Sequence, residues 1–293
     1  MNPATENNDS LRAQTTTGII LAVASAILMG TIGVFSKLSG LGAEAITFFR
    51  LFFGALFMLV FLIGKGRLHL IISRPSSAVI INGFFLAGFI IFYVQAMNYT
   101  TMANAIMIIY FAPLTAAIYA HFFMGERLNL SSLVLILLAL FGFAMMLEFR
   151  LDLQGDRLRA LGLGLAGIGM LCYCAFILIN RKISDHVFSS TFYQLLVGSL
   201  VMAPLFFHTV GPITKQQWLL LVGAGMFPGF LAILFAVIAL RQLQAAAFGT
   251  LAYFEPLAVV FFGWSIFGES LTPLQLAGCG IILVCGILKS LNN

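Results

Sequence analysis

The chain has 293 residues, of which 61% are hydrophobic and only 9% are charged, and its mean hydropathy is +1.06. Soluble domains carry about 25% charged residues, so this chain lacks the polar surface of a soluble protein and is predicted to be an integral membrane protein. The net charge of +5 does not indicate a nucleic-acid partner, because the Lys and Arg residues lie mostly between apolar stretches, as loop charges do in membrane proteins.

Residues 1–17 are polar, carry both signs of charge and lack both a compact basic stretch and a small-residue cleavage site. They are predicted to form a short, disordered cytoplasmic tail rather than a cleaved signal peptide. A slight extension of the first helix into residues 10–14 is the alternative.

Ten apolar stretches follow, each close to the roughly 20 residues that a helix needs to cross a bilayer. The predicted all-α fold therefore has ten transmembrane helices, at 18–36, 44–64, 78–98, 102–124, 131–149, 158–180, 187–207, 216–240, 244–267 and 274–290. The connections are too short to hold a soluble domain. Small residues recur every four positions in the first helix (Gly18, Ala22, Ala26 and Gly30), which predicts close packing against a neighbouring helix.

Residues 101–130 and 244–273 share one pattern at a shift of 143 positions, with a proline inside the helix and Gly-Glu-x-Leu after it. Earlier helices match at a shift of 144, as in Thr47 with Thr191. Such self-similarity predicts two repeats, 18–149 and 158–290, of five helices each. An odd number of helices inverts the second repeat relative to the first, as in alternating-access transporters.

Glu255 is the principal candidate functional residue. It lies about ten residues into its helix, or about 15 Å deep at roughly 1.5 Å per residue, where a carboxylate is costly and usually functional. It could bind a proton, a cation or a substrate ammonium, or instead pin the kink at Pro256. Its counterpart in the first repeat is Ala112, so the fold itself does not require an acid there.

Pro113 and Pro256 each remove a backbone donor and free a carbonyl one turn earlier, at Ile109 and Ala252. They are predicted to be hinges or static kinks. Arg50, in the second helix, could attract a substrate carboxylate or pair with Glu44, Glu148 or carbonyls. Further candidate substrate contacts are the polar and aromatic residues Asn82, Tyr93, Asn104, Tyr110 and its counterpart Tyr253.

Other polar residues are assigned structural roles. Glu126 and Glu269 lie at helix junctions, where they are expected to accept from backbone donors of the following helix. His121 and His208 lie near span ends and are predicted to be interfacial. The four cysteines lie in apolar stretches without companion ligands, so neither a metal site nor a cofactor is predicted.

The charge distribution predicts that both termini are cytoplasmic. This orientation places nine basic residues inside, against Lys37, Arg150, Arg157, Arg159 and Lys215 outside. The nine are Arg12, Lys65, Arg67, Arg74, Arg127, Arg181, Lys182, Arg241 and Lys289. The cluster between Arg150 and Arg159 favours the opposite orientation.

The two copies of the proline and Gly-Glu-x-Leu pattern, together with Phe49-Arg50-Leu51-Phe52, resemble the EamA-type repeat of the drug/metabolite transporter (DMT) superfamily. Within that superfamily the chain most resembles the YddG group of bacterial amino-acid exporters. The resemblance implies ten helices, an inner-membrane location, and a cavity formed by helices 1–4 and 6–9, with helices 5 and 10 peripheral. Arg50 departs from the repeat, since its counterpart is Gln194.

The leading functional hypothesis is a secondary transporter that exports small amphipathic metabolites, first of all amino acids and among these aromatic ones, across the bacterial inner membrane. Its predicted partners are a small-molecule substrate and the lipid bilayer, with protons as the candidate coupling ion. A carrier of drugs or other metabolites with the same fold is the alternative. An integral membrane lipid-modifying enzyme is disfavoured, because the four scattered histidines supply no catalytic cluster.

Overall fold

The computed structural model describes residues 3–72, 74–150, 157–209 and 211–291, and within these ranges every regular element is helical. In the first repeat the helices are α1 (Pro3–Ser39), α2 (Ala43–Gly64), α3 (His69–Ile72), α4 (Ser77–Ala96), α5 (Met102–Ile109), α6 (Ala112–Phe123) and α7 (Leu130–Met146). In the second they are α8 (Arg157–Lys182), α9 (Val187–Thr209), α10 (Lys215–Ala224), the π-helix η1 (Gly225–Leu231), α11 (Ala232–Gln242), α12 (Ala245–Ala252), α13 (Phe254–Phe267) and α14 (Pro273–Leu291).

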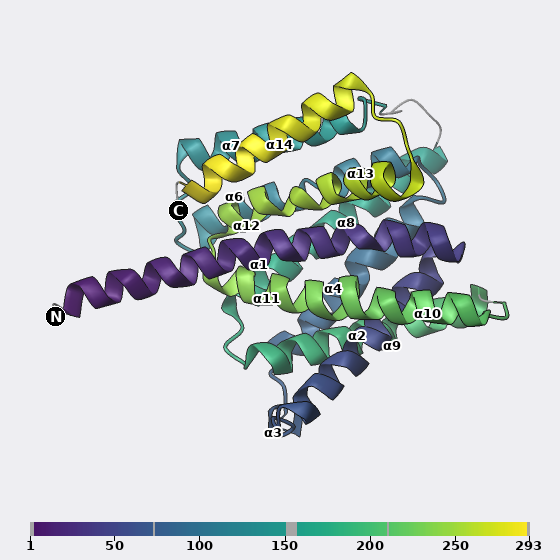
Figure 1. Ribbon diagram of the computed structural model, residues 1–293, viewed down its shortest axis with the longest axis horizontal. Helices are drawn as coiled ribbons and strands as arrows, with labels where there is room; N and C mark the ends of the chain where they lie inside the picture. Colours follow the sequence, from purple (N-terminus) through teal and green to yellow (C-terminus); the bar gives the residue numbers. More distant parts are fainter. Residues whose placement is uncertain (1–2, 73, 151–156, 210, 292–293) are drawn as a thin grey trace.

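These elements form a bundle of membrane-spanning helices that lie side by side (Figure 1). In the described residues, nine helical segments are long and apolar enough to cross a bilayer, and the apolar helix α7 is shorter. Each of the pairs α5–α6 and α12–α13 makes one crossing, as do α10, η1 and α11 together. The fold confirms the predicted all-α membrane architecture.

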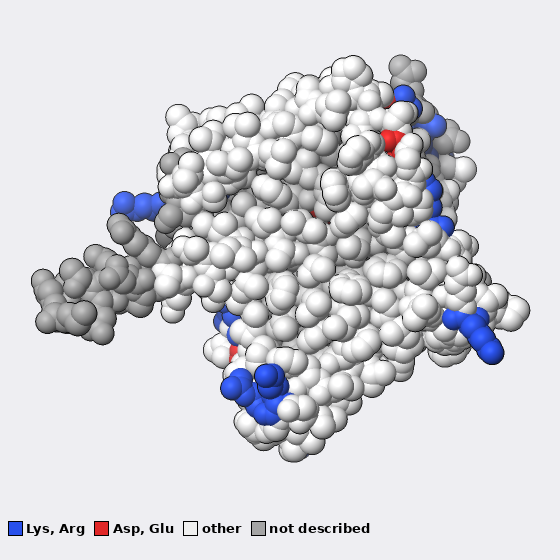
Figure 2. All heavy atoms as spheres, in the orientation of Figure 1, with Lys and Arg blue, Asp and Glu red and all other residues white. Residues whose placement is uncertain are grey.

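Charged side chains gather at the two ends of the bundle on the face shown in Figure 2 and leave an almost uncharged belt between them. The belt lies over the spanning helices of Figure 1, whose axes run between the charged ends. Large apolar side chains such as Phe122, Leu219 and Val284 are exposed along these helices. Because a bilayer interior solvates such residues and excludes charge, this belt is the lipid-facing surface.

The N-terminal segment differs from the prediction. Helix α1 begins at Pro3, so residues 3–17 continue the first spanning helix instead of forming a disordered tail (Figure 1). Extending an existing helix carries no nucleation cost. Proline is well tolerated in the first turn, where its missing N–H has no intrahelical partner. The side chain of Arg12, used in the orientation count, lies outside the described residues, as does the 151–156 segment.

Small residues bring α1 close to the second repeat, as the sequence predicted. A Cβ atom at Gly30 would lie 2.6 Å from Ala258 Cβ and 3.1 Å from the Glu255 carbonyl oxygen. At Gly18 it would lie 3.0 Å from the Leu243 side chain. The glycines therefore allow α1 to pack directly on α13 and on the α11–α12 turn.

The two repeats place equivalent breaks in equivalent helices. The predicted helices 102–124 and 244–267 are each divided, at Tyr110–Phe111 and at Tyr253, before the prolines at 113 and 256. Proline lacks the donor that would continue the helical ladder, so a break in the turn before it is expected. Helices α7 and α14, the last of each repeat, pack against each other at one side of the bundle (Figure 1).

The predicted helix 216–240 contains a π-helical turn that sequence patterning did not anticipate. Segment η1 contains Pro228, and its glycines Gly225 and Gly229 pack closely against α2. A Cβ atom at Gly229 would collide with the Arg50 carbonyl oxygen, and one at Gly225 would collide with Phe53. The π-turn thus lets the second repeat approach the backbone of α2 at Arg50.

Candidate functional site

A cavity of about 590 Å³ lies between the two repeats. Side chains from α1, α2, α4, α5, α7, α8, α11, α12 and α13 line it, and most of them are apolar. Its charged lining residues are Arg50 of α2 and Glu255 of α13. A mostly apolar chamber with few polar groups is the usual form of a small-molecule site.

Glu255 reaches the cavity because the helix break at Tyr253 starts a new helix just before it. It lies in the first turn of α13, where the unpaired N–H groups of the helix favour an acidic side chain. Gly30 allows α1 to pack against the Glu255 backbone, which fixes this turn at the cavity wall. The break therefore converts a position within a span into a helix N-terminus.

Arg50 belongs to the buried face of α2 and is only 9% exposed. Its Nη2 atom lies 3.6 Å from the sulfur of Met29, a weak acceptor, and its Nε atom is buried without a hydrogen-bond partner among the described residues. A guanidinium has five N–H donors, so this side chain retains strong donor capacity beside the cavity. The sequence allowed Arg50 to pair with Glu44 or Glu148. Neither ion pair occurs among the described residues, where Glu148 pairs with Arg150 instead.

Three tyrosines line the same cavity as Arg50 and Glu255. Tyr93, Tyr110 and Tyr173 line the cavity, and all three interact electrostatically with Glu255. Arg50 also interacts with Glu255, and both charges act on Tyr173. The Tyr173 ring stacks on Phe89 at a centroid distance of 4.7 Å. The site therefore combines one acidic side chain, Glu255, with one cationic side chain, Arg50, and several aromatic rings.

Three of the other predicted site residues, Asn82, Asn104 and Tyr253, lie outside this cavity. Asn82 is fully buried between helices and donates to the Phe176 carbonyl oxygen at 3.4 Å. Asn104 is 1% exposed and donates to Thr100 Oγ1 at 3.0 Å. Tyr253 is fully buried and donates to the Tyr110 carbonyl oxygen at 2.7 Å. Of the two prolines, Pro256 lines the cavity and Pro113 packs against Gly249.

Several cavity residues were missed by sequence reasoning. Tyr173 stood within an apolar Cys-Tyr-Cys run, and the contact of Met29 with Arg50 left no pattern in the sequence. Phe143 and Met146 of α7 also line the cavity, although the family resemblance placed this helix at the periphery. Among the described residues, helix α9, which the resemblance placed at the cavity, supplies no lining residue. A hydropathy pattern cannot distinguish a cavity-facing side from a packed one.

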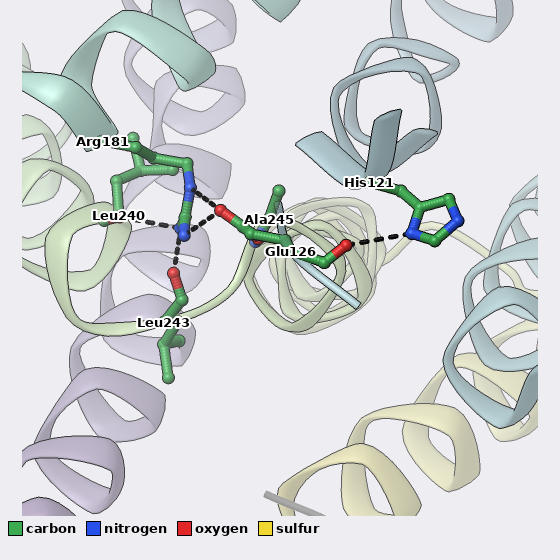
Figure 3. Close-up of polar contacts among 6 residues, drawn as sticks. All are labelled: His121, Glu126, Arg181, Leu240, Leu243 and Ala245. Carbon is green, nitrogen blue, oxygen red and sulfur yellow. Dashed lines mark hydrogen bonds and ion pairs between the residues drawn. The ribbon is translucent and has the colours of Figure 1, made fainter. Parts of the chain in front are cut away.

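A polar cluster around Glu126 joins the two repeats and lies outside the residues that line the cavity (Figure 3). Arg181 forms an ion pair with Glu126, in which Arg181 Nε lies 2.7 Å from Glu126 Oε1. The other carboxylate oxygen of Glu126 accepts from the Ala245 N–H at 2.8 Å. Glu126 therefore caps α12 of the other repeat and not α7, the following helix that the sequence suggested.

The histidines and cysteines supply no metal site in the described part of the chain, where no group of three potential ligands occurs. His121 Nδ1 lies 3.0 Å from the Glu126 carbonyl oxygen and stabilises the turn after α6 (Figure 3). The side chain of His208 lies outside the described residues.

Comparisons with known proteins agree with this architecture. An uncharacterised transporter of Archaeoglobus fulgidus is 30% identical over 91% of this chain and 93% of its own length. The pseudopaline exporter CntI of Pseudomonas aeruginosa is 24% identical over 93% and 95% of the two chains. The threonine/homoserine exporter RhtA of Escherichia coli is 25% identical over 94% and 91%. These relatives are transporters rather than enzymes.

A solved crystal structure has the same fold, with a TM-score of 0.84 at 17% sequence identity, covering 94% of this chain and 98% of the other. The profile of the EamA-like transporter family matches twice, at residues 16–148 and 160–290. The two matches coincide with the two repeats and together cover most of the sequence. The chain belongs to the EamA-like transporter family, within the drug/metabolite transporter superfamily.

Proposed function

We propose that this transporter exports small zwitterionic metabolites, first of all amino acids, across the bacterial inner membrane by alternating access. The observation that supports this substrate class is the presence of Arg50 and Glu255, one positive and one negative, in the same mostly apolar cavity. An amino acid carries the complementary pair of charges on adjacent groups.

Each charge has a distinct task in this proposal. The Arg50 guanidinium, which has an unpartnered buried donor, binds the substrate carboxylate. Glu255 accepts hydrogen bonds from the substrate ammonium. The apolar wall and the stacked rings of Phe89 and Tyr173 surround the substrate side chain. An apolar surface of this kind accommodates aliphatic or aromatic side chains.

Two named exporters among the relatives support export, and one of them supports amino acids as substrates, whereas a third relative is named as an S-adenosylmethionine uptake transporter. RhtA is named as an exporter of threonine and homoserine, which are both amino acids, and CntI as an exporter of pseudopaline. Protons are the proposed coupling ion, because Glu255 is a titratable group inside the substrate cavity. Both termini are proposed to be cytoplasmic on the basis of the basic-residue distribution.

The test is counterflow in liposomes that contain the purified full-length protein. Vesicles loaded with one unlabelled amino acid are diluted into each labelled amino acid in turn. We expect saturable counterflow of at least one amino acid. The matching hydroxy acid, which lacks the ammonium, and the matching amine, which lacks the carboxylate, should compete only weakly. Exchange of cationic drugs or neutral metabolites without exchange of any amino acid would reject the substrate class and favour the alternative carrier function.

A further inference from the structure

We propose that Lys37, Glu126, Arg181 and Glu269 form two gates that close alternately at opposite ends of the substrate cavity. The inference rests on the alternating access proposed above. Lys37 is the counterpart of Arg181 at a shift of 144 positions, and Glu126 is the counterpart of Glu269 at a shift of 143. Each basic residue pairs with the acid of the other repeat, as Lys37–Glu269 and Arg181–Glu126.

The Arg181–Glu126 gate is closed in this structure. The side chains are only 13% and 17% exposed. Arg181 Nη1 also donates to the carbonyl oxygens of Leu240, at 3.0 Å, and Leu243, while Glu126 accepts from the Ala245 N–H (Figure 3). The pair therefore ties together the end of α8, the turn after α6 and the α11–α12 turn. No cavity-lining residue in the described structure comes from these segments.

The Lys37–Glu269 gate is less closed, although its ion pair is formed at 2.5 Å. Its side chains are 53% and 52% exposed, and Lys37 lies 4.3 Å above the Phe267 ring. Within the described residues, the hydrogen bond, ion pair and cation–π contact of Lys37 and Glu269 do not reach the α4–α5 turn, which corresponds to the α11–α12 turn. Met102, the counterpart of Ala245, is 64% exposed, whereas Ala245 is 1% exposed.

The lining of the cavity also differs between the two ends. Its lining includes Ser36 of α1, Met97 at the end of α4, and Met102 at the start of α5, all near the Lys37 gate. Residues at the end of the bundle opposite the two chain termini (Figure 1) thus contribute to the cavity lining, whereas those of the Arg181–Glu126 gate do not. Inverted repeats move between two access states when each half takes the conformation of the other.

This exchange specifies the contacts of the opposite state. Glu269 would accept from the Met102 N–H, as Glu126 accepts from Ala245 here. Lys37 would reach the carbonyl oxygens of Met97 and Thr100, the counterparts of Leu240 and Leu243. The Arg181–Glu126 pair would then become the exposed one. Because an Arg fork holds a carboxylate and carbonyls together better than a Lys ammonium does, the state seen here is the favoured resting state.

The test measures the reaction of a membrane-impermeant maleimide with single cysteines on either side. The chain carries alanines in place of its four native cysteines, and its thermal unfolding midpoint is first matched to that of the parent. Met102→Cys reports the Lys37 gate and Ala245→Cys the Arg181 gate. In the parent we expect fast labelling at 102 and slow labelling at 245, given their exposures.

Arg181→Gln should increase labelling at 245 and decrease it at 102, each by about ten- to hundredfold, because it removes charge-assisted bonds from one state only. Arg157→Gln, on the same helix and away from the gate, is the matched control and should change neither rate. Arg181→Lys, which retains a charge, provides the same comparison with a smaller shift should the Gln variant fold poorly.

A parallel increase at both sites would mean that Arg181 only stabilises the fold, and unchanged rates would mean that it does not gate. Either result overturns the proposal. The labelling needs no substrate. Opposite changes in the labelling rates at 245 and 102 would therefore support the gates even if no amino acid showed counterflow. Failure of the proposed substrate class and failure of the gates are therefore distinguishable.

Discussion

The hydroxyl of Tyr253 donates a 2.7 Å hydrogen bond to the carbonyl oxygen of Tyr110, its own counterpart 143 positions earlier in the chain. The two rings lie 5.5 Å apart. Two residues related by an inverted repeat can meet only close to the axis that relates the halves. This contact therefore locates that axis beside the helix breaks that flank the cavity.

We expect Tyr253→Phe to lower the thermal unfolding midpoint of the purified protein. The change removes the donor and leaves the buried Tyr110 carbonyl without this bond, a loss of about 1–3 kcal/mol. Tyr119→Phe is the matched control, because Tyr119 is 46% exposed. Equal midpoints for the two variants would show that the inter-repeat bond contributes no stability.

The helix breaks lead to a prediction about transport rate. Pro113→Ala and Pro256→Ala each restore a backbone donor and favour a continuous helix across the break. If the breaks act as hinges, each variant should insert normally and lose roughly tenfold in flux, or about 1.4 kcal/mol in the barrier. Pro204→Ala, in a helix that does not line the cavity, is the control. Normal flux in both proline variants would show that the breaks are static kinks and not hinges.

The loop carboxylate of Asp185 predicts a pH-dependent contribution to stability. Burial alone would raise the Asp185 pKa, but hydrogen bonds from Ser76 N (3.1 Å) and Ser76 Oγ (2.6 Å), together with Arg241, outweigh it and lower the pKa below its ordinary 3.8. A depressed pKa gives stability that is present at neutral pH and is lost as pH falls through the folded-state value.

Asp185→Asn should therefore unfold at a lower temperature than the parent at pH 7, with the two midpoints converging below pH 3.8. Thermal unfolding in detergent across this range measures the difference. A constant difference at every pH would show that the carboxylate charge has no part in holding Ser76.

The proposed orientation is tested with reporters fused after Asn293. The basic-residue count predicts activity from a reporter that works only in the cytoplasm and none from one that works only in the periplasm. The opposite pattern would invert the orientation. In that case the Lys37–Glu269 gate would face the cytoplasm.

Hydropathy and self-similarity were sufficient to predict the two repeats and the spanning helices, of which nine in the described residues are long enough to cross a bilayer and α7 is shorter, because both signals depend on long stretches of sequence. The kinks before Pro113 and Pro256 were likewise foreseeable. The π-turn at Pro228 was not, since it has no equivalent in the first repeat and depends on the close approach of Gly229 to α2.

The site was only partly predictable. Glu255 and Arg50 stood out because charges inside spans are rare, and both line the cavity. Asn82 lies among packed helices instead, because polarity alone does not reveal which side of a helix faces a cavity. The relation between Lys37 and Arg181 was missed because the two residues share only their charge, and their partners became visible only in three dimensions.

The proposed recognition of a zwitterion is tested most directly by binding measurements on Arg50→Gln and Glu255→Gln. The ligands are the amino acid that gives counterflow, its amine analogue and its carboxylic-acid analogue. Arg150→Gln and Glu148→Gln, in the loop after α7, are the matched controls.

Arg50→Gln should weaken binding of the amino acid and the carboxylic acid by about 10–100-fold and leave the amine unchanged, because charge-assisted bonds contribute about 1.5–3 kcal/mol. Glu255→Gln should weaken binding of the amino acid and the amine and leave the carboxylic acid unchanged. Equal effects on all three ligands in both variants, or parent-like binding throughout, would contradict the assignment of one charge to each end of the substrate.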